Sequence, residues 1–377
     1  MGCTANQKWK LGSLFTAAVS ISFTFNAFAL DVKIGILLSL TGSQAYYGKE
    51  ARNGIDLALA ENKDPNLKIQ ISVEDTQSNP SEAAKGINKL ITKDKVTVVI
   101  GDMVSSNTIA AGSLAEKEKI PIISPGSTND SVTLKKNYIY RACFTDSFQG
   151  LVMANFATQN LKAKTAVILQ DADSDYSIGL SKNFENRFTA DGGKVLKSLR
   201  YSQKDTNFTA QLGDVRKLKP DVVFIPGFHQ QVGVILREAK DLQIQSKMLG
   251  GDGWDTQELR QIAKGSEIGS YFSNHYSSES KDPKLQNFIK SYKEKFKSEP
   301  SSFSALGYDS ANLVIQAIKN AKSADSEKIN LALSQIKNFK AATGDITIDG
   351  NHNALKPAVI LKFMPTGYKY ITSVKPN

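Results

Sequence analysis

Two segments in the first half of the sequence combine glycine with hydroxyl side chains, a composition that can bind a small anion. Residues 101–108 lead into a predicted helix, and residues 124–129 follow an apolar run. Amide and hydroxyl groups at the positive end of a helix suit a carboxylate, and glycine lets a ligand approach the backbone. Ordinary capping and turn chemistry is the simpler explanation of either segment taken alone. The candidate ligand contacts here are Ser105, Gly126, Ser127 and Thr128.

A third segment, residues 250–254, could bind a positively charged group of a ligand. It places Asp252 and Trp254 among three glycines, directly after an apolar run. The carboxylate could bind an ammonium group, and the indole face could contact an apolar or cationic group. Alternatively, Asp252 could stabilise a turn and Trp254 could belong to the core.

These segments follow short apolar runs that alternate with stretches of helical period, a pattern typical of parallel sheets covered by helices. We expect the first series to contain strands at 32–38, 67–73, 96–100 and 121–124, and helices at 47–61, 81–92 and 105–117. A second series has strands at 166–169, 194–201, 222–225 and 247–249, and helices at 176–190, 207–218 and 229–242. In such sheets, ligands bind beyond the carboxyl ends of the strands, where all three glycine-containing segments fall.

The rest of the sequence predicts helices at 283–297, 303–320 and 326–337, and closing strands at 358–363 and 368–373. The chain is longer than one core usually serves, so we expect two lobes of α/β architecture with a ligand cleft between them.

Common enzyme motifs are missing from the sequence. It has no phosphate-binding glycine motif, no G-x-S-x-G segment and no H-E-x-x-H segment, and its three histidines lie far apart. We therefore expect a binding protein that has no metal and no cofactor.

The N-terminus predicts export. Lys8 and Lys10 precede an uncharged apolar run that ends near Phe25, and Ala27-Phe28-Ala29 fits a cleavage site, so residues 1–29 are a predicted signal peptide. The net charge is +10, but the lysines are scattered among acidic residues, which argues against nucleic-acid binding. We expect a released, monomeric protein in the periplasm.

The sequence resembles the Leu/Ile/Val-binding proteins, the periplasmic receptors of branched-chain amino-acid ABC importers. The similarity runs from Val32 to about Phe363. The matching segments include 34–42, Tyr47-Gly48, Asn53-Gly54, 74–76, 99–101 with Ser105-Ser106, 123–125 with Thr128, and Arg141, Asp146, Gln149 and Gly150.

The resemblance implies the type I periplasmic binding protein fold, with two Rossmann-like lobes joined by three crossing segments. Lobe one would hold residues 30–147 and 277–354, and lobe two residues 148–276 and 355–377. It also implies that lobe one grips the head group of an amino acid through Ser105, the Gly126 carbonyl and Thr128. The further site positions that it implies are Tyr47, Tyr176, Phe228, Asp252 and Tyr308.

Two departures from the family pattern bear on specificity. Phe228 stands where the branched-chain receptors carry Tyr, and Asp252 stands where they carry Glu. By resemblance, the protein captures a small amino acid, branched-chain or otherwise hydrophobic, and delivers it to an ABC transporter permease. The alternatives are a related receptor for amides, urea or aromatic acids, a sensor, and an exported small-molecule hydrolase.

Overall fold

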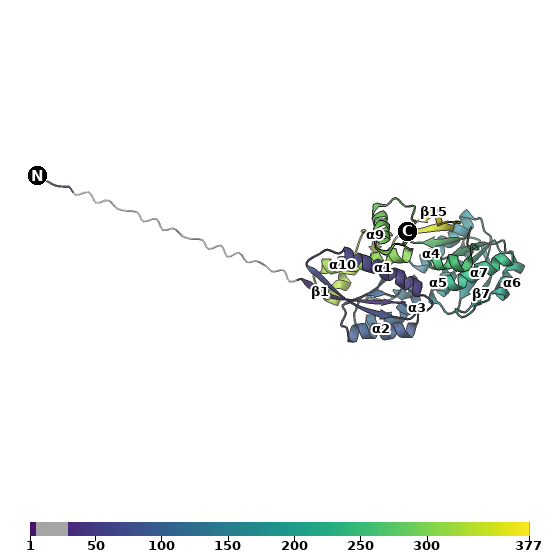
Figure 1. Ribbon diagram of the computed structural model, residues 1–377, viewed down its shortest axis with the longest axis horizontal. Helices are drawn as coiled ribbons and strands as arrows, with labels where there is room; N and C mark the ends of the chain where they lie inside the picture. Colours follow the sequence, from purple (N-terminus) through teal and green to yellow (C-terminus); the bar gives the residue numbers. More distant parts are fainter. Residues whose placement is uncertain (5–28, 377) are drawn as a thin grey trace.

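Two β-sheets, each packed between two layers of helices, organise the chain into two lobes (Figure 1). The computed structural model describes residues 1–4 and 29–376, so most of the predicted signal peptide lies outside the described residues. Within that range, no helix combines the length and the apolar composition needed to cross a membrane.

The first sheet is parallel throughout and has five strands in the order β2-β1-β3-β4-β5. The strands are β1 (Leu30–Leu38), β2 (Leu67–Asp75), β3 (Val98–Gly101), β4 (Ile122–Ser124) and β5 (Ile139–Arg141). Ile34 and Ile36 of β1 face one layer of helices, whereas Leu37 faces the other, because side chains alternate along a strand. The helices are α1 (Ala45–Glu61) and α10 (Ser302–Ala321) on one face, and α2 (Pro80–Thr92) and α3 (Ser105–Lys117) on the other.

The second sheet has seven strands in the order β15-β14-β10-β9-β8-β6-β7. The strands are β6 (Thr165–Asp171), β7 (Lys194–Tyr201), β8 (Val222–Ile225), β9 (Lys247–Gly250), β10 (Tyr271–Asn274), β14 (Ala358–Phe363) and β15 (Tyr368–Val374). Its helices are α4 (Asp146–Asn155), α5 (Asp175–Ala190), α6 (Thr209–Leu218), α7 (His229–Asp241) and α8 (Gln257–Ala263). Strand β14 runs antiparallel to both β10 and β15, whereas the other pairs are parallel.

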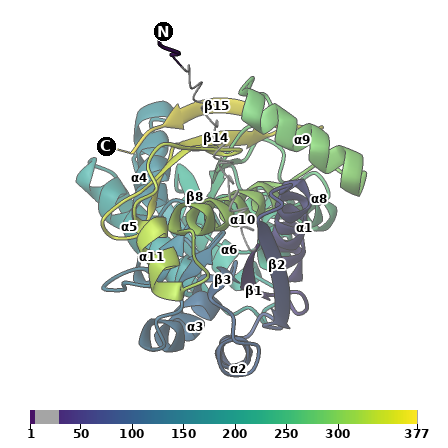
Figure 2. The ribbon, with the colours of Figure 1, turned by 90° about the vertical axis from the view of Figure 1, so that its left-hand side faces the viewer.

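The remaining elements complete the first lobe and the connections (Figure 2). They are α9 (Pro283–Phe296), α11 (Ser326–Ser334), β11 (Phe339–Ala341), β12 (Gly344–Ile348) and β13 (Ala354–Leu355). The chain passes between the lobes three times: after β5, after β10 and before β14.

Some of the predicted element bounds are wrong. Helix α11 ends at Ser334, not at Lys337, because the carbonyl of Ile336 accepts a hydrogen bond from the Ile348 amide and the chain turns into β11. Strands β5, β10, β11, β12 and β13 and helices α4 and α8 have no counterpart among the predicted elements.

Glycine allows α1 and α10 to pack with their backbones in close contact. A Cβ atom at Gly54 would overlap the backbone of Ser304, and one at Gly307 would overlap the backbone of Ala51. This contact fixes the N-terminal ends of both helices beside each other, which is where Tyr47 and Phe303 point toward the second lobe.

Candidate ligand-binding site

A small cavity of about 20 Å³ lies between the two lobes. The elements that reach it are loops and helix N-termini that follow strands of both sheets, as expected for open parallel sheets. Its lining residues are Tyr47, Met103, Val104, Ser105, Gly126, Tyr176, Phe228, Asp252, Gly253 and Phe303.

Lobe one contributes a helix N-terminus that has no cap of its own. Helix α3 begins at Ser105, and the preceding cap position is Val104, whose side chain cannot accept a hydrogen bond from the helix amides. The first amides of a helix lack intrahelical partners and carry partial positive charge. This end of the cavity is therefore suited to a carboxylate.

The loop before α3 is held rigidly by a buried aspartate. The Asp102 carboxylate accepts hydrogen bonds from Thr76 Oγ1 at 2.6 Å and from the Val104 amide at 2.8 Å. Ser39 and Asn107 also donate to it. Because these four donors satisfy Asp102 within the protein, its role is to shape the loop.

The neighbouring loop places its three predicted residues differently. Gly126 lines the cavity, and a Cβ there would overlap the Met103 side chain. The Ser127 hydroxyl donates to the Asp102 carbonyl at 3.0 Å and contacts the Thr108 hydroxyl at 2.7 Å, so it serves the loop. The Thr128 hydroxyl is buried and has no hydrogen-bond partner within the described residues.

Lobe two contributes Asp252, which is buried. Its carboxylate accepts a hydrogen bond from Gln149 Nε2 at 3.1 Å and lies 3.1 Å from His275 Nε2. These contacts orient Asp252 toward the cavity but leave it without a cationic partner at neutral pH, because burial lowers the pKa of His275 to about 4.

Asp146, one of the residues that carry the family resemblance, is buried but does not line the cavity. Both carboxylate oxygens are buried and have no hydrogen-bond partner in the described part of the chain. Burial raises the pKa of Asp146 well above its usual range, and the charge of Asp252 adds to this. The neighbouring Thr128 hydroxyl opposes this shift, but burial dominates and favours the neutral, protonated acid.

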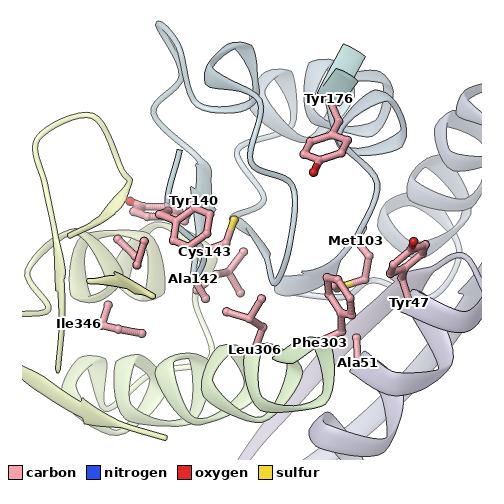
Figure 3. Packing of buried hydrophobic residues seen from close by; sticks show 14 of the residues in the cluster. Tyr47, Ala51, Met103, Tyr140, Ala142, Cys143, Tyr176, Phe303, Leu306 and Ile346 are labelled. Atoms are coloured by element: carbon pink, nitrogen blue, oxygen red, sulfur yellow. The ribbon is translucent and has the colours of Figure 1, made fainter. Parts of the chain in front are cut away.

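Aromatic rings form the apolar wall of the cavity. The Tyr47 ring lies 5.3 Å from Phe228 and 4.8 Å from Phe303, and Tyr176 lies 5.5 Å from Phe228. Figure 3 shows Tyr176 pointing from one lobe toward Met103, Phe303 and Tyr47 of the other. The sequence analysis did not select Phe303, although it begins a predicted helix with an apolar face.

Four of the predicted site residues do not line the cavity: Ser127, Thr128, Trp254 and Tyr308. Trp254 packs in the core of lobe two, because its indole lies against Gly250 and its Nε1 donates to the Ile225 carbonyl at 3.0 Å. The Tyr308 ring lies 5.0 Å from Phe288, and its hydroxyl donates to Glu61 at 2.6 Å.

The lobes also contact each other directly beside the cavity. Asn129 Nδ2 of lobe one donates to the Asp175 carbonyl of lobe two at 2.6 Å, and the Asp175 amide donates to Ser106 Oγ at 3.2 Å. Both bonds involve the backbone of Asp175, the first residue of α5, and they hold the next residue, Tyr176, over the cavity. Residues 1–4 and 29–376 contain no group of three or more His, Cys, Asp or Glu side chains arranged to hold a metal ion.

Comparisons with known proteins agree with this architecture. The chain is 28% identical to the Leu/Ile/Val-binding protein homolog 1 of Brucella abortus, over 94% of this chain and 96% of that protein. The structure of a leucine-binding protein, LivK, from Thermotoga maritima is 36% identical, with a TM-score of 0.89 over 92% of this chain and 99% of that one. The branched-chain amino-acid transporter substrate-binding protein LivJ of Streptococcus pneumoniae, solved with isoleucine, is 33% identical, with a TM-score of 0.85 over 92% and 100%.

A family model described as periplasmic binding protein matches residues 31–364, which is most of the chain. The matched range includes elements of both sheets. The chain therefore belongs to the periplasmic binding protein family, as a solute-binding protein of the branched-chain amino-acid ABC transporter type.

Proposed function

We propose that this protein captures a small hydrophobic amino acid, most simply a branched-chain one, between its lobes and delivers it to an ABC transporter permease. The observation that carries the proposal is the charge arrangement of the cavity. The buried carboxylate of Asp252, which lines the cavity, suits an ammonium group, and the uncapped N-terminus of α3 suits a carboxylate. Only a zwitterion uses both.

The apolar wall then takes the side chain of the ligand. Tyr47, Phe228 and Phe303 offer ring faces and edges but no charged group at that end. Asp252 and Phe228 replace the Glu and Tyr of the branched-chain receptors, so the choice among hydrophobic amino acids is part of the proposal.

The size of the ligand is sufficient for tight binding. An amino acid has about nine non-hydrogen atoms, and a ceiling near −1.5 kcal/mol per atom allows about −13 kcal/mol. Micromolar affinity needs only about −8 kcal/mol. Closure stabilises the complex because the ligand contacts both lobes only when they are closed.

The proposal also covers where the protein acts, which protein it delivers the ligand to, and whether it catalyses a reaction. Export to the periplasm follows from the predicted signal peptide, and delivery to a permease follows from the transporter type. We propose a binding role with no catalysis. In the described residues, the His229 and His275 side chains hydrogen-bond to Tyr47 and Asp252, and no histidine side chain is paired with a serine hydroxyl.

A thermal-shift screen of mature protein, unfolded and refolded to remove carried-over ligand, tests the proposal. A ligand in excess raises the melting temperature by mass action. We expect leucine, isoleucine or valine to raise it by several degrees, whereas acetamide, urea and benzoate leave it unchanged. A response confined to a neutral amide, urea or benzoate would overturn the amino-acid assignment.

A further inference from the structure

The hydroxyl group of Tyr47 is bonded to the opposite lobe, not to the cavity. Tyr47 lies in the first turn of α1 in lobe one, and its hydroxyl donates to the Gly253 carbonyl of lobe two at 2.8 Å. The same oxygen accepts the backbone amide of His229 at 3.1 Å and lies 2.9 Å from His229 Nδ1. Three polar groups of lobe two thus converge on one atom of lobe one.

Helix α7 of lobe two lacks a cap of its own. Its cap position is Phe228, which has no side-chain acceptor, so the first amide of the helix has no partner within lobe two. In the closed structure the Tyr47 oxygen accepts that amide and acts as the cap from the other lobe. This bond exists only while the lobes are together.

The number of hydrogen atoms available on the Tyr47 hydroxyl determines which group donates in each of these hydrogen bonds. The hydroxyl has one hydrogen, and because the Gly253 carbonyl can only accept, that hydrogen goes to Gly253. His229 Nδ1 must therefore donate to the Tyr47 oxygen. On the outer side, the half-exposed Glu258 carboxylate lies 2.7 Å from His229 Nε2 and favours a second proton on the ring, whereas burial lowers the pKa of His229 to about 4. A neutral ring protonated at Nδ1 would leave an unprotonated Nε2 facing the Glu258 carboxylate, so the two contacts together favour the doubly protonated ring, in which Nδ1 donates to Tyr47 and Nε2 donates to Glu258.

We propose that the Tyr47 hydroxyl and His229 form a ligand-independent latch that stabilises the closed state, with His229 as a positioning residue. The proposal rests on the proposed function in one respect, that closure retains the ligand. His229 does not line the cavity, so the latch adds the same stabilisation for every ligand that fits. The cavity wall discriminates among ligands, and the latch sets how long the lobes stay closed.

Tyr47→Phe tests the latch because it removes the hydroxyl but keeps the ring against Phe303. We expect the Kd values for leucine, isoleucine and valine to rise by a common factor of about 10, as loss of a few buried hydrogen bonds implies. The change should appear in the dissociation rate measured by stopped flow, with the association rate preserved. Tyr292→Phe is the matched control, since that hydroxyl bonds only to Asn53 and Glu50 within lobe one.

His229→Ala should weaken binding less, because the backbone amide remains, and should have no further effect in the Tyr47→Phe background. Unchanged dissociation rates in Tyr47→Phe, or an effect on one amino acid only, would overturn the latch.

A second measurement separates failure of the latch from failure of the proposed function. Spin labels at Lys49→Cys and Lys204→Cys, both exposed and in different lobes, report the interlobe distance without added ligand. Tyr47→Phe should lower the closed fraction relative to wild type and to Tyr292→Phe. If no amino acid binds the wild type, the amino-acid proposal fails, and this distance measurement still decides the latch: an unchanged closed fraction would overturn it.

Discussion

At the scale of single residues, the buried aspartates differ in the number of donors that the protein gives them. Asp102 has donors from Ser39, Thr76, Val104 and Asn107, whereas Asp252 has partners on two sides and Asp146 has none. Burying a carboxylate is unfavourable unless it is paired. The fully paired Asp102 therefore shapes the fold, whereas Asp252, which is incompletely paired and lines the cavity, is available to a ligand.

The first residue-scale prediction compares the two ends of the cavity. Asp252→Ala should weaken binding of leucine 10-fold or more, because it removes a charged partner of the ammonium group. Ser105→Ala should weaken binding less, since the α3 amides remain. Titration calorimetry of both variants measures this, with Asp214→Ala on the outer face of lobe two as the control. Unchanged affinity in Asp252→Ala would contradict the head-group assignment.

The sequence predicted part of this site and could not predict the rest. Ser105, Gly126 and Asp252 follow strands directly, so strand position was enough to place them near a cleft. Trp254 has the same sequence setting, but a turn directs its indole into the core. The role of His229 depends on Tyr47, 182 residues away, and no local pattern contains that contact.

At the scale of elements, the sequence predicted the long periodic helices and the buried strands well because their patterns repeat over several turns or residues. Strands β7 and β8 and helix α3 have the predicted bounds. The short strands β10 and β13 were missed because their few residues show no alternation, and pairing with neighbouring strands stabilises them. Tertiary context decides such segments.

Several helices end in a lysine with left-handed backbone geometry, where glycine is the usual residue. Lys297, at the end of α9, has φ 57° and an exposed side chain. Lys297→Gly should raise the free energy of unfolding by about 0.5–1 kcal/mol, because glycine adopts this conformation without strain. Urea unfolding measures it.

Lys290→Gly in the middle of the same helix is the matched control. It should lower the free energy of unfolding by about 1 kcal/mol. Equal effects of the two substitutions would show that the left-handed geometry at Lys297 carries no strain.

At the scale of the whole molecule, the three connections between the lobes pack against one another. His275, just after β10, stacks on Phe144 of the first connection with ring centroids 3.9 Å apart. Lys356, in the third connection, is also buried, and its amino group bonds to Thr343. His275 thus joins the first two connections to Asp252, and Lys356 of the third connection lies close enough to lower the pKa of His275.

This burial predicts a pH dependence of stability. Burial lowers the pKa of His275 to about 4, Lys356 lowers it further, and Asp252 and Asp255 oppose the shift. Between about pH 4 and the ordinary value near 6.5, the unfolded chain binds the proton more readily, so stability falls as pH falls through this window. From pH 7 to pH 5 the loss through this residue is about 2 kcal/mol.

Buried carboxyl groups with raised pKa values change the free energy of unfolding with pH in the opposite direction. They are present in both wild type and His275→Gln, so the difference between the two proteins isolates the contribution of His275. Urea unfolding at pH 7 and pH 5 should show a smaller pH dependence in the variant by about 2 kcal/mol. An equal pH dependence in the two proteins would mean that His275 takes up its proton in the folded state.

The place of β14 in the second sheet has a consequence for how the chain acquires its structure. Strand β10 pairs with β14, and β14 pairs with β15, although 83 residues of lobe one and its connections separate Asn274 from Ala358. During synthesis, lobe two lacks two of its strands until β14 and β15 have emerged. Neither lobe is a contiguous stretch of polypeptide, so the nascent chain stays incomplete to its end, with slow, long-range strand pairing as the final step.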